Sequence, residues 1–277
     1  MSAPMPQQLR FDLPSGPIAA LDNGVRDAPT VLLVPGYTGS KEDFQPLLRP
    51  LAAAGLRAVA IDQRGQYQSA WARTEAGYRV SALAADLLAL AESLSAEVGS
   101  LHLLGHSFGG LVARDAVLNR SELFTDLVLM SSGPAAISGN RRVLLDSGER
   151  VLAEGGMHRL WEHIEERAQA DPRYLRPAPA LRAFLYERFL ATDPVGLRVM
   201  GTALREEADR TEELAGVGMR ILVLYGEQDD AWPPDVQADM AGRLAARAAV
   251  ISGAAHSPAV ENTAGTLSAL LDFWLGS

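Results

Sequence analysis

The chain has 277 residues, which suits one large domain or one domain with an inserted lid. Apolar residues make up 48% of it and charged residues 21%, so a substantial core is expected and wholesale disorder is excluded. The formal net charge is -9 and no run of basic residues occurs, so nucleic acid and anionic membrane surfaces are poor partners.

The chain contains no cysteine, which excludes disulfides, a thiol nucleophile and thiolate metal sites. No basic region followed by a long apolar region is visible in residues 1–10, and no apolar stretch approaches ~20 residues. We therefore expect a cytoplasmic protein with no membrane span, no metal and no cofactor. Lys41 is the single lysine among 25 lysine and arginine residues, a bias that indicates a GC-rich bacterial genome. Nothing in the sequence indicates an oligomeric state.

Short apolar runs alternate with longer helical patterns in the first part of the chain. Continuous apolar strands separated by amphipathic helices are typical of βαβ units, in which helices cover both faces of a parallel sheet. The predicted strands are Thr30–Val34, Arg57–Ile61, Leu101–Leu104 and Leu127–Met130, and the predicted helices are Asp43–Ala54, Ser81–Ala96 and one that ends near Asn119.

Between about residues 133 and 215 the alternation stops, and the patterns are helical with no convincing strand. An insertion of this length favours an all-helical cap over the carboxyl ends of the strands, where open sheets bind ligands. The alternative is a set of crossover helices that pad the sheet. We expect residues 1–132 and 216–277 to form the core, and 133–215 the cap. The alternation returns with strand Ile221–Tyr225, helix Asp235–Leu244, strand Ala249–Ile251 and helix Ala264–Leu275.

Six residues, Gly105-His106-Ser107-Phe108-Gly109-Gly110, join a predicted strand to a predicted helix. A serine between small residues at such a junction is typical of a nucleophile elbow. The turn is tight, so Gly105 and Gly109 are needed where a Cβ would clash. The alternative is a glycine-rich turn with an incidental serine. Partners for Ser107 elsewhere in the chain favour the elbow.

A serine nucleophile needs a base to accept its proton and a third group to orient that base. His256 is the best placed of the five histidines, because it follows the predicted strand Ala249–Ile251 through a loop of small residues. The alternative for His256 is an ordinary surface histidine. We expect His106 to point away from Ser107 and to pack or hydrogen-bond locally. The remaining histidines are His102 in a strand, and His158 and His163 in the predicted cap.

Acidic residues follow strand Ile221–Tyr225, directly before the strand that leads to the histidine. In this architecture the acid lies between serine and histidine in chain order. Asp229 and Asp230 both meet that condition, and Glu227 is a weaker candidate. The alternative is a solvated acidic loop without a catalytic role.

These motifs together resemble the α/β-hydrolase superfamily, in particular the members with a helical cap between strands 6 and 7. The resemblance extends from about Val31 to Trp274 and implies a mostly parallel eight-stranded sheet flanked by helices. By resemblance Ser107 is the nucleophile, Asp229 rather than Asp230 is the acid, and His256 is the base. The motifs that carry it are Gly105–Gly110, Gly226-Glu227-Gln228-Asp229 with Pro233 four residues on, Gly253–Pro258, and the fold-supporting turn Asp62-Gln63-Arg64-Gly65.

Two departures from the family pattern concern the loops around the expected site. Pro35-Gly36-Tyr37 stands where the family often has His-Gly. The oxyanion donor at this place is a backbone N–H, so the exchange of a side chain does not remove it. By that alignment the amides of Tyr37 and Phe108 form the oxyanion hole. Tyr67 replaces a second glycine after Asp62–Gly65, and its ring is expected to affect loop shape or substrate access.

The expected activity is hydrolysis of a carboxylic ester or lactone through an acyl-enzyme on Ser107. Small-molecule esters with an apolar or aromatic acyl group are the expected substrates, and the expected pocket residues are Tyr37, Phe108, Trp161 and Trp232. The same triad also suits a thioester, an amide or a C–C bond beside a ketone. A ligand-binding member of the fold without turnover is a further alternative, although no triad residue is missing.

Overall fold

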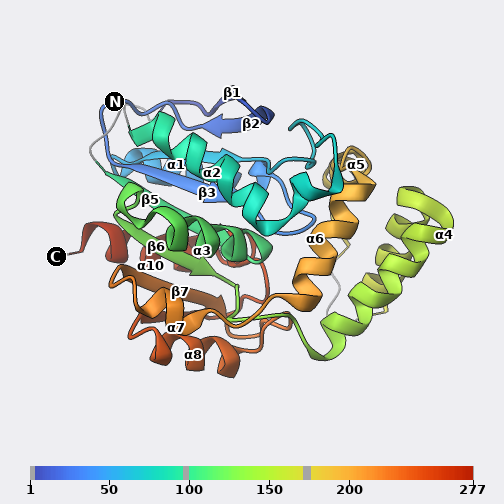
Figure 1. Ribbon diagram of the computed structural model, residues 1–277. Helices are drawn as coiled ribbons and strands as arrows, with labels where there is room; N and C mark the ends of the chain where they lie inside the picture. Colours follow the sequence, from blue (N-terminus) through green and yellow to red (C-terminus); the bar gives the residue numbers. More distant parts are fainter. Residues whose placement is uncertain (1–3, 96–99, 171–175, 277) are drawn as a thin grey trace.

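A sheet of eight strands forms the centre of the computed structural model, which describes residues 4–95, 100–170 and 176–276 (Figure 1). The strand order across the sheet is β1-β2-β4-β3-β5-β6-β7-β8. The pairs β1–β2 and β2–β4 are antiparallel, and the remaining pairs are parallel. The strands are β1 (Gln7–Leu13), β2 (Gly16–Asp22), β3 (Thr30–Val34), β4 (Arg57–Ile61), β5 (Leu101–His106), β6 (Asp126–Met130), β7 (Arg220–Gly226) and β8 (Arg247–Ile251).

The predicted mostly parallel sheet is confirmed, and the six apolar runs predicted as strands correspond to β3 through β8. The bounds of β3 and β4 agree with the predicted runs to the residue. The hairpin of β1 and β2 was not predicted. Its outer strand β1 has no fully buried residue, so it shows no continuous apolar run.

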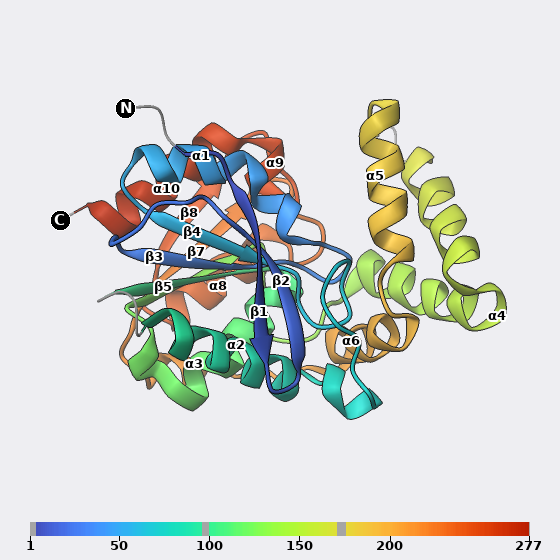
Figure 2. The same cartoon turned by 90° about the horizontal axis from the view of Figure 1, so that it is seen from above.

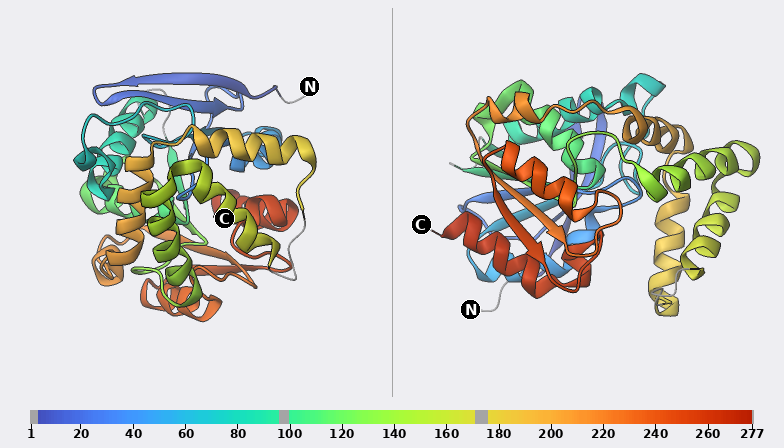
Figure 3. Two further views of the ribbon diagram at one scale, coloured as in Figure 1. Left: turned by 90° about the vertical axis from the view of Figure 1, so that its right-hand side faces the viewer. Right: turned by 90° about the horizontal axis from the view of Figure 1, so that it is seen from below.

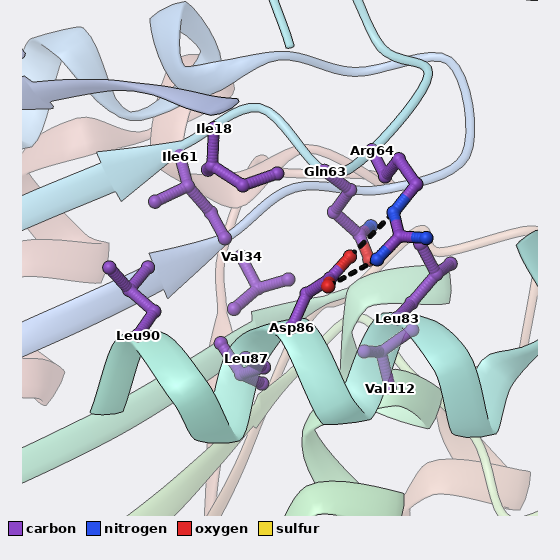
Figure 4. Close-up of a pocket in the computed structure, with 10 residues that line it drawn as sticks. All are labelled: Ile18, Val34, Ile61, Gln63, Arg64, Leu83, Asp86, Leu87, Leu90 and Val112. Atoms are coloured by element: carbon purple, nitrogen blue, oxygen red, sulfur yellow. Dashed lines mark hydrogen bonds and ion pairs between the residues drawn. The ribbon is translucent and has the colours of Figure 1, made fainter. Parts of the chain in front are cut away.

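Helices cover both faces of the sheet (Figure 2). The helices α2 (Val80–Ser95), α3 (Phe108–Arg120) and α8 (Pro234–Arg243) contribute apolar side chains to one buried cluster, and α1 (Gln45–Ala53) and α10 (Thr263–Leu275) contribute to the other. A small cavity remains between the sheet and α2, where Ile18 and Val34 face Leu87 beside the ion pair of Arg64 with Asp86 (Figure 4).

Four helices lie between β6 and β7: α4 (Gly139–Gln169), α5 (Pro179–Leu190), α6 (Pro194–Glu206) and α7 (Thr211–Ala215). The described residues of this segment contain no strand. Helix α4 changes direction at Gly156, whose φ of 68° is not helical. Helices α4 and α5 stand beyond one end of the sheet (Figures 2 and 3). The division of this segment into a separate cap of residues 133–215 stays a prediction.

The helical segment is attached to the core through Asp193, directly before α6. The backbone N–H of Asp193 donates to the carbonyl oxygen of Gly65 at 2.8 Å, and its carboxylate accepts a hydrogen bond from the buried hydroxyl of Tyr78. The short elements that complete the fold are the 3-10 turns η1 (Lys41–Phe44), η2 (Glu75–Tyr78) and η3 (Ser121–Leu123), and helix α9 (Pro258–Glu261). Within the described ranges, no helix is long and apolar enough to cross a membrane.

Candidate active site

Ser107 lies at the turn between β5 and α3 with φ 55° and ψ -122°. A left-handed φ is unfavourable for a residue with a Cβ, so this serine is held in a strained conformation by the packing around it. A Cβ on Gly105 would lie 2.4 Å from the carbonyl oxygen of Gly109, and one on Gly109 would lie 2.5 Å from that of Val34. Glycine is therefore required at both positions, as predicted, because backbone atoms of neighbouring segments occupy the space that a Cβ would need.

The hydroxyl of Ser107 is the first member of a chain of two hydrogen bonds. Its Oγ lies 2.9 Å from Nε2 of His256, and Nδ1 of the same ring lies 2.9 Å from Oδ1 of Asp229. Because the carboxylate can only accept, the neutral ring donates from Nδ1 and offers the lone pair of Nε2 to the serine. The structure therefore brings together the three residues that the sequence analysis selected, from the loops after β5, β7 and β8.

Asp229 is 4% exposed and is surrounded by hydrogen-bond donors. The backbone N–H of Ala231 and Nε2 of Gln237 each donate to its carboxylate at 3.0 Å, in addition to His256. Burial raises the pKa of Asp229, but the hydrogen bonds and the nearby imidazole outweigh burial, and its pKa lies below the usual value. Asp229 is therefore ionised and able to stabilise positive charge on His256.

Gln237 was missed by the sequence analysis. It is completely buried in α8, and its amide bridges Oδ2 of Asp229 and the carbonyl oxygen of Trp232 at 2.7 Å. A glutamine on the buried face of a helix was the available signal, since buried polar side chains require partners.

The two alternative acids have other partners. Asp230 forms an ion pair with Arg141 of α4 at 2.7 Å, and both side chains are well exposed. Glu227 accepts hydrogen bonds at 2.9 Å from the hydroxyl of Ser252 and from the backbone N–H of Gly253. Neither contacts His256, so Glu227 joins the acid loop to the histidine loop and Asp230 joins it to the helical segment.

His106 makes a long-range contact, in place of the local one expected. Its Nε2 donates to the carbonyl oxygen of His256 at 2.8 Å. The remaining histidines do not contact Ser107: His102 pairs with Asp126, His158 contacts the hydroxyl of Tyr186, and His163 contacts Ser147.

Two backbone N–H groups beside Ser107 are free to bind an anion. Within the part of the chain that the structure describes, the N–H groups of Tyr37 and Phe108 have no hydrogen-bond acceptor. Phe108 is the first residue of α3, where the helix dipole also favours negative charge. The arrangement can bind an oxyanion that forms on a carbonyl group attacked by Ser107.

The four expected pocket residues lie in different surroundings. Phe108 is fully buried and Trp232 is 3% exposed, with its indole N–H donating to the carbonyl oxygen of Ala135. Tyr37 is half-buried against both the core and the helical segment, and burial raises its pKa. The Trp161 ring centroid lies 5.5 Å from those of Tyr186 and Phe189, within the helical segment. Their roles in substrate binding stay predictions.

Residues 26–263 match the family model described as serine aminopeptidase, S33. A putative carbamate hydrolase RutD from Pantoea ananatis is 30% identical over 225 residues, which cover 79% of this chain and 78% of that protein. A carboxylesterase structure from Nitrososphaera gargenis superposes with a TM-score of 0.81 at 19% identity, covering 96% of this chain and 98% of that one. The enol-lactonase from Burkholderia xenovorans superposes with a TM-score of 0.80 at 20% identity, covering 96% of this chain and all of that one (100%).

Proposed function

This chain belongs to the α/β-hydrolase superfamily, in the family described as serine aminopeptidase, S33, and is a hydrolase; we propose that it cleaves a carboxylic ester or lactone. The observation that carries the proposal is the unbroken path of hydrogen bonds from Ser107 Oγ through the His256 ring to the carboxylate of Asp229. In this proposal Ser107 is the nucleophile, His256 the general base and Asp229 the orienting acid.

The first half of the reaction forms an acyl-enzyme. Nε2 of His256 accepts the proton of the Ser107 hydroxyl while Oγ attacks the carbonyl carbon of the substrate. The carbonyl oxygen becomes an oxyanion, which accepts hydrogen bonds from the amides of Tyr37 and Phe108. Each such donor is worth about 3 kcal/mol of barrier in comparable sites.

The second half returns the enzyme to its starting state. The tetrahedral intermediate collapses, and Nε2–H of His256 protonates the leaving oxygen as the C–O bond breaks. Water then attacks the acyl-serine with His256 as its base, and the carboxylic acid leaves. Throughout, Asp229 stays ionised, because its low pKa suits it to stabilise the imidazolium that forms twice in the cycle.

A carbamate is the second candidate substrate, since the Pantoea ananatis relative is described as a putative carbamate hydrolase. A carbamate also presents a carbonyl carbon to Ser107. With an aryl carbamate, Oγ attacks that carbon, the C–O bond to the phenol breaks with proton transfer from His256, and water then hydrolyses the carbamoyl group left on Ser107. The carboxylesterase and the enol-lactonase share the fold at low sequence identity, so their support for ester chemistry extends to the architecture alone.

The test is hydrolysis of p-nitrophenyl esters of increasing chain length, in parallel with aryl carbamates. Ser107→Ala should remain folded by circular dichroism and lose at least about 1000-fold in kcat/KM, because it removes the nucleophile. A fluorophosphonate probe should label the wild type on Ser107 and leave Ser107→Ala unlabelled. Retained turnover in a folded Ser107→Ala protein would contradict the proposal.

A further inference from the structure

We propose that Gln66, assisted by Gln63, is a positioning residue that orients the oxyanion-hole amide of Tyr37. The inference rests on the proposed function and assigns a task to a turn that the family resemblance describes only as supporting the fold. Both glutamines belong to the segment that follows β4, and both are buried, with exposed fractions of 0% for Gln66 and 3% for Gln63.

The two side chains hold three consecutive carbonyl groups of the loop after β3. Nε2 of Gln63 donates to the carbonyl oxygen of Pro35 at 2.8 Å. Nε2 of Gln66 donates to the carbonyl oxygen of Gly36 at 2.7 Å and to that of Tyr37 at 3.2 Å. The bond to Gly36 is the shortest of the three, and Gly36 carries the carbonyl of the peptide unit that contains the Tyr37 N–H.

The direction of that N–H follows from the geometry of the peptide bond. In a planar trans peptide the C=O and the following N–H point in opposite directions. A donor that fixes the Gly36 carbonyl therefore also fixes the Tyr37 N–H, pointing it away from Gln66. The peptide lies close to the nucleophile, because a Cβ on Gly36 would lie 3.1 Å from Cβ of Ser107.

The orientation of the Gln66 amide is itself determined by its partners. Its Oε1 accepts the backbone N–H of Gln63 at 3.0 Å, which leaves Nε2 as the group that faces the carbonyls. No water can replace these bonds easily, because the side chain is fully buried. The Gly36 carbonyl also accepts the backbone N–H of Gly39 at 3.2 Å, and Gln66 adds a shorter side-chain bond that is fixed before substrate arrives, as preorganised transition-state stabilisation requires.

The same turn also secures the far end of the loop. Asp62 accepts the backbone N–H of Lys41 at 2.8 Å and the ammonium of Lys41 at 2.8 Å. Arg64, between the two glutamines, extends instead toward Asp86 of α2, as Figure 4 shows. Within this turn the glutamines are the side chains that contact the carbonyls of residues 35–37, so their effect can be separated from that of Arg64.

Gln66→Met removes the donor and keeps a side chain of similar length without charge. We expect kcat/KM for a p-nitrophenyl ester to fall by about 100-fold, with KM changed less than about threefold, because the lost interaction acts on the transition state. An alkyl trifluoromethyl ketone, which forms an oxyanion when Ser107 adds to it, should lose affinity by a similar factor. Gln45→Met is the matched control, since Gln45 is exposed at the start of α1, and it should leave kcat/KM and ketone affinity unchanged.

Gln66→Glu keeps the proposal testable if Gln66→Met fails to fold. The ionised carboxylate cannot donate to Gly36, whereas the protonated acid can. The ratio of variant to wild-type kcat/KM should therefore rise by at least about tenfold as the pH is lowered from 8 to 6, because a buried carboxyl beside carbonyl oxygens has a raised pKa.

Three results would overturn the role of Gln66: full activity in Gln66→Met, a fall in kcat without loss of ketone affinity, or a Gln66→Glu ratio independent of pH. Each of these presupposes a wild-type protein that hydrolyses the ester and binds the ketone. A wild-type protein inert toward both would contradict the proposed function itself, so the two failures are distinguishable.

Discussion

His106 holds the backbone of His256, since its Nε2 lies 2.8 Å from the carbonyl oxygen of that residue. The residue directly before the proposed nucleophile is thereby joined to the loop that carries the proposed base, 150 positions away in the chain. Burial, followed by the nearby imidazole of His256, lowers the pKa of His106 to about 4. His106 is therefore neutral at pH 7 and adds no positive charge where the proposed mechanism forms the His256 imidazolium.

The pKa of His106 predicts a pH-dependent contribution to stability. Because the folded-state pKa of about 4 lies below the unfolded value of ~6.5, the unfolded chain binds more protons between those values. The contribution of His106 to the free energy of unfolding is thus fully present above pH 7 and is lost as the pH falls toward 4. We expect about 2 kcal/mol less free energy of unfolding at pH 5 than at pH 7 from His106 alone.

The measurement is urea unfolding of wild type and His106→Gln at both pH values. Glutamine does not titrate and keeps an N–H donor. The free energy of unfolding of His106→Gln should therefore fall from pH 7 to pH 5 by about 2 kcal/mol less than that of the wild type. His158→Gln is the control, because His158 is exposed in the helical segment. The free energy of unfolding of this variant should fall between pH 7 and pH 5 as much as that of the wild type. Equal declines in wild type and His106→Gln would refute the assignment.

The neighbouring aspartates should differ sharply. Asp229→Asn should lower kcat by about 10⁴-fold, because a neutral amide no longer stabilises the imidazolium or enforces the Nδ1–H tautomer of His256. Asp230→Asn removes only an exposed ion pair with Arg141 and should stay within about twofold of wild type. Kinetics on one short ester suffice, and the reverse order of effects would place the acid one residue later.

Gln237 should affect catalysis by holding the carboxylate of Asp229 in position. Gln237→Leu removes one donor to a buried carboxylate, and a hydrogen bond to a charged group is worth about 1.5–3 kcal/mol. We expect kcat/KM to fall by about tenfold or more, because the carboxylate that orients His256 loses one of the donors that hold it in place. Gln45→Leu, on the exposed start of α1, serves as the control. An unchanged kcat/KM would reduce Gln237 to a packing residue.

Trp161 tests whether the helical segment selects substrates. Trp161→Ala removes a ring that packs on Phe189 and Tyr186, and we expect the ratio of kcat/KM between long and short acyl esters to change by about tenfold. Thermal unfolding of the same variant measures its packing role. An equal fall on both esters with a lower Tm would assign Trp161 to the interior of the segment alone.

Much of the fold could be predicted because its signals are local. The strands from β3 to β8 are short apolar runs bounded by turns, and the bend at Ser107 needs small neighbours at Gly105 and Gly109. Such features depend on residues within a few positions of one another. The exception is the hairpin of β1 and β2, whose outer strand β1 has mostly exposed side chains and makes no apolar run.

The sequence by itself also indicated that Ser107, His256 and an acid of the loop after β7 would meet, because each follows a parallel strand and such strands present their carboxyl ends at one edge. The resemblance to the α/β-hydrolase superfamily selected Asp229 among the acids of that loop. Only the tertiary structure decided the partners that hold them: His106 on the carbonyl of His256, Gln237 on Asp229, and Gln66 on Gly36. A buried polar side chain must find a partner, but its sequence position does not say which distant backbone or carboxylate packing will bring within 3 Å. Those contacts arise when the elements pack and exclude water, so they are properties of the assembled sheet and its loops.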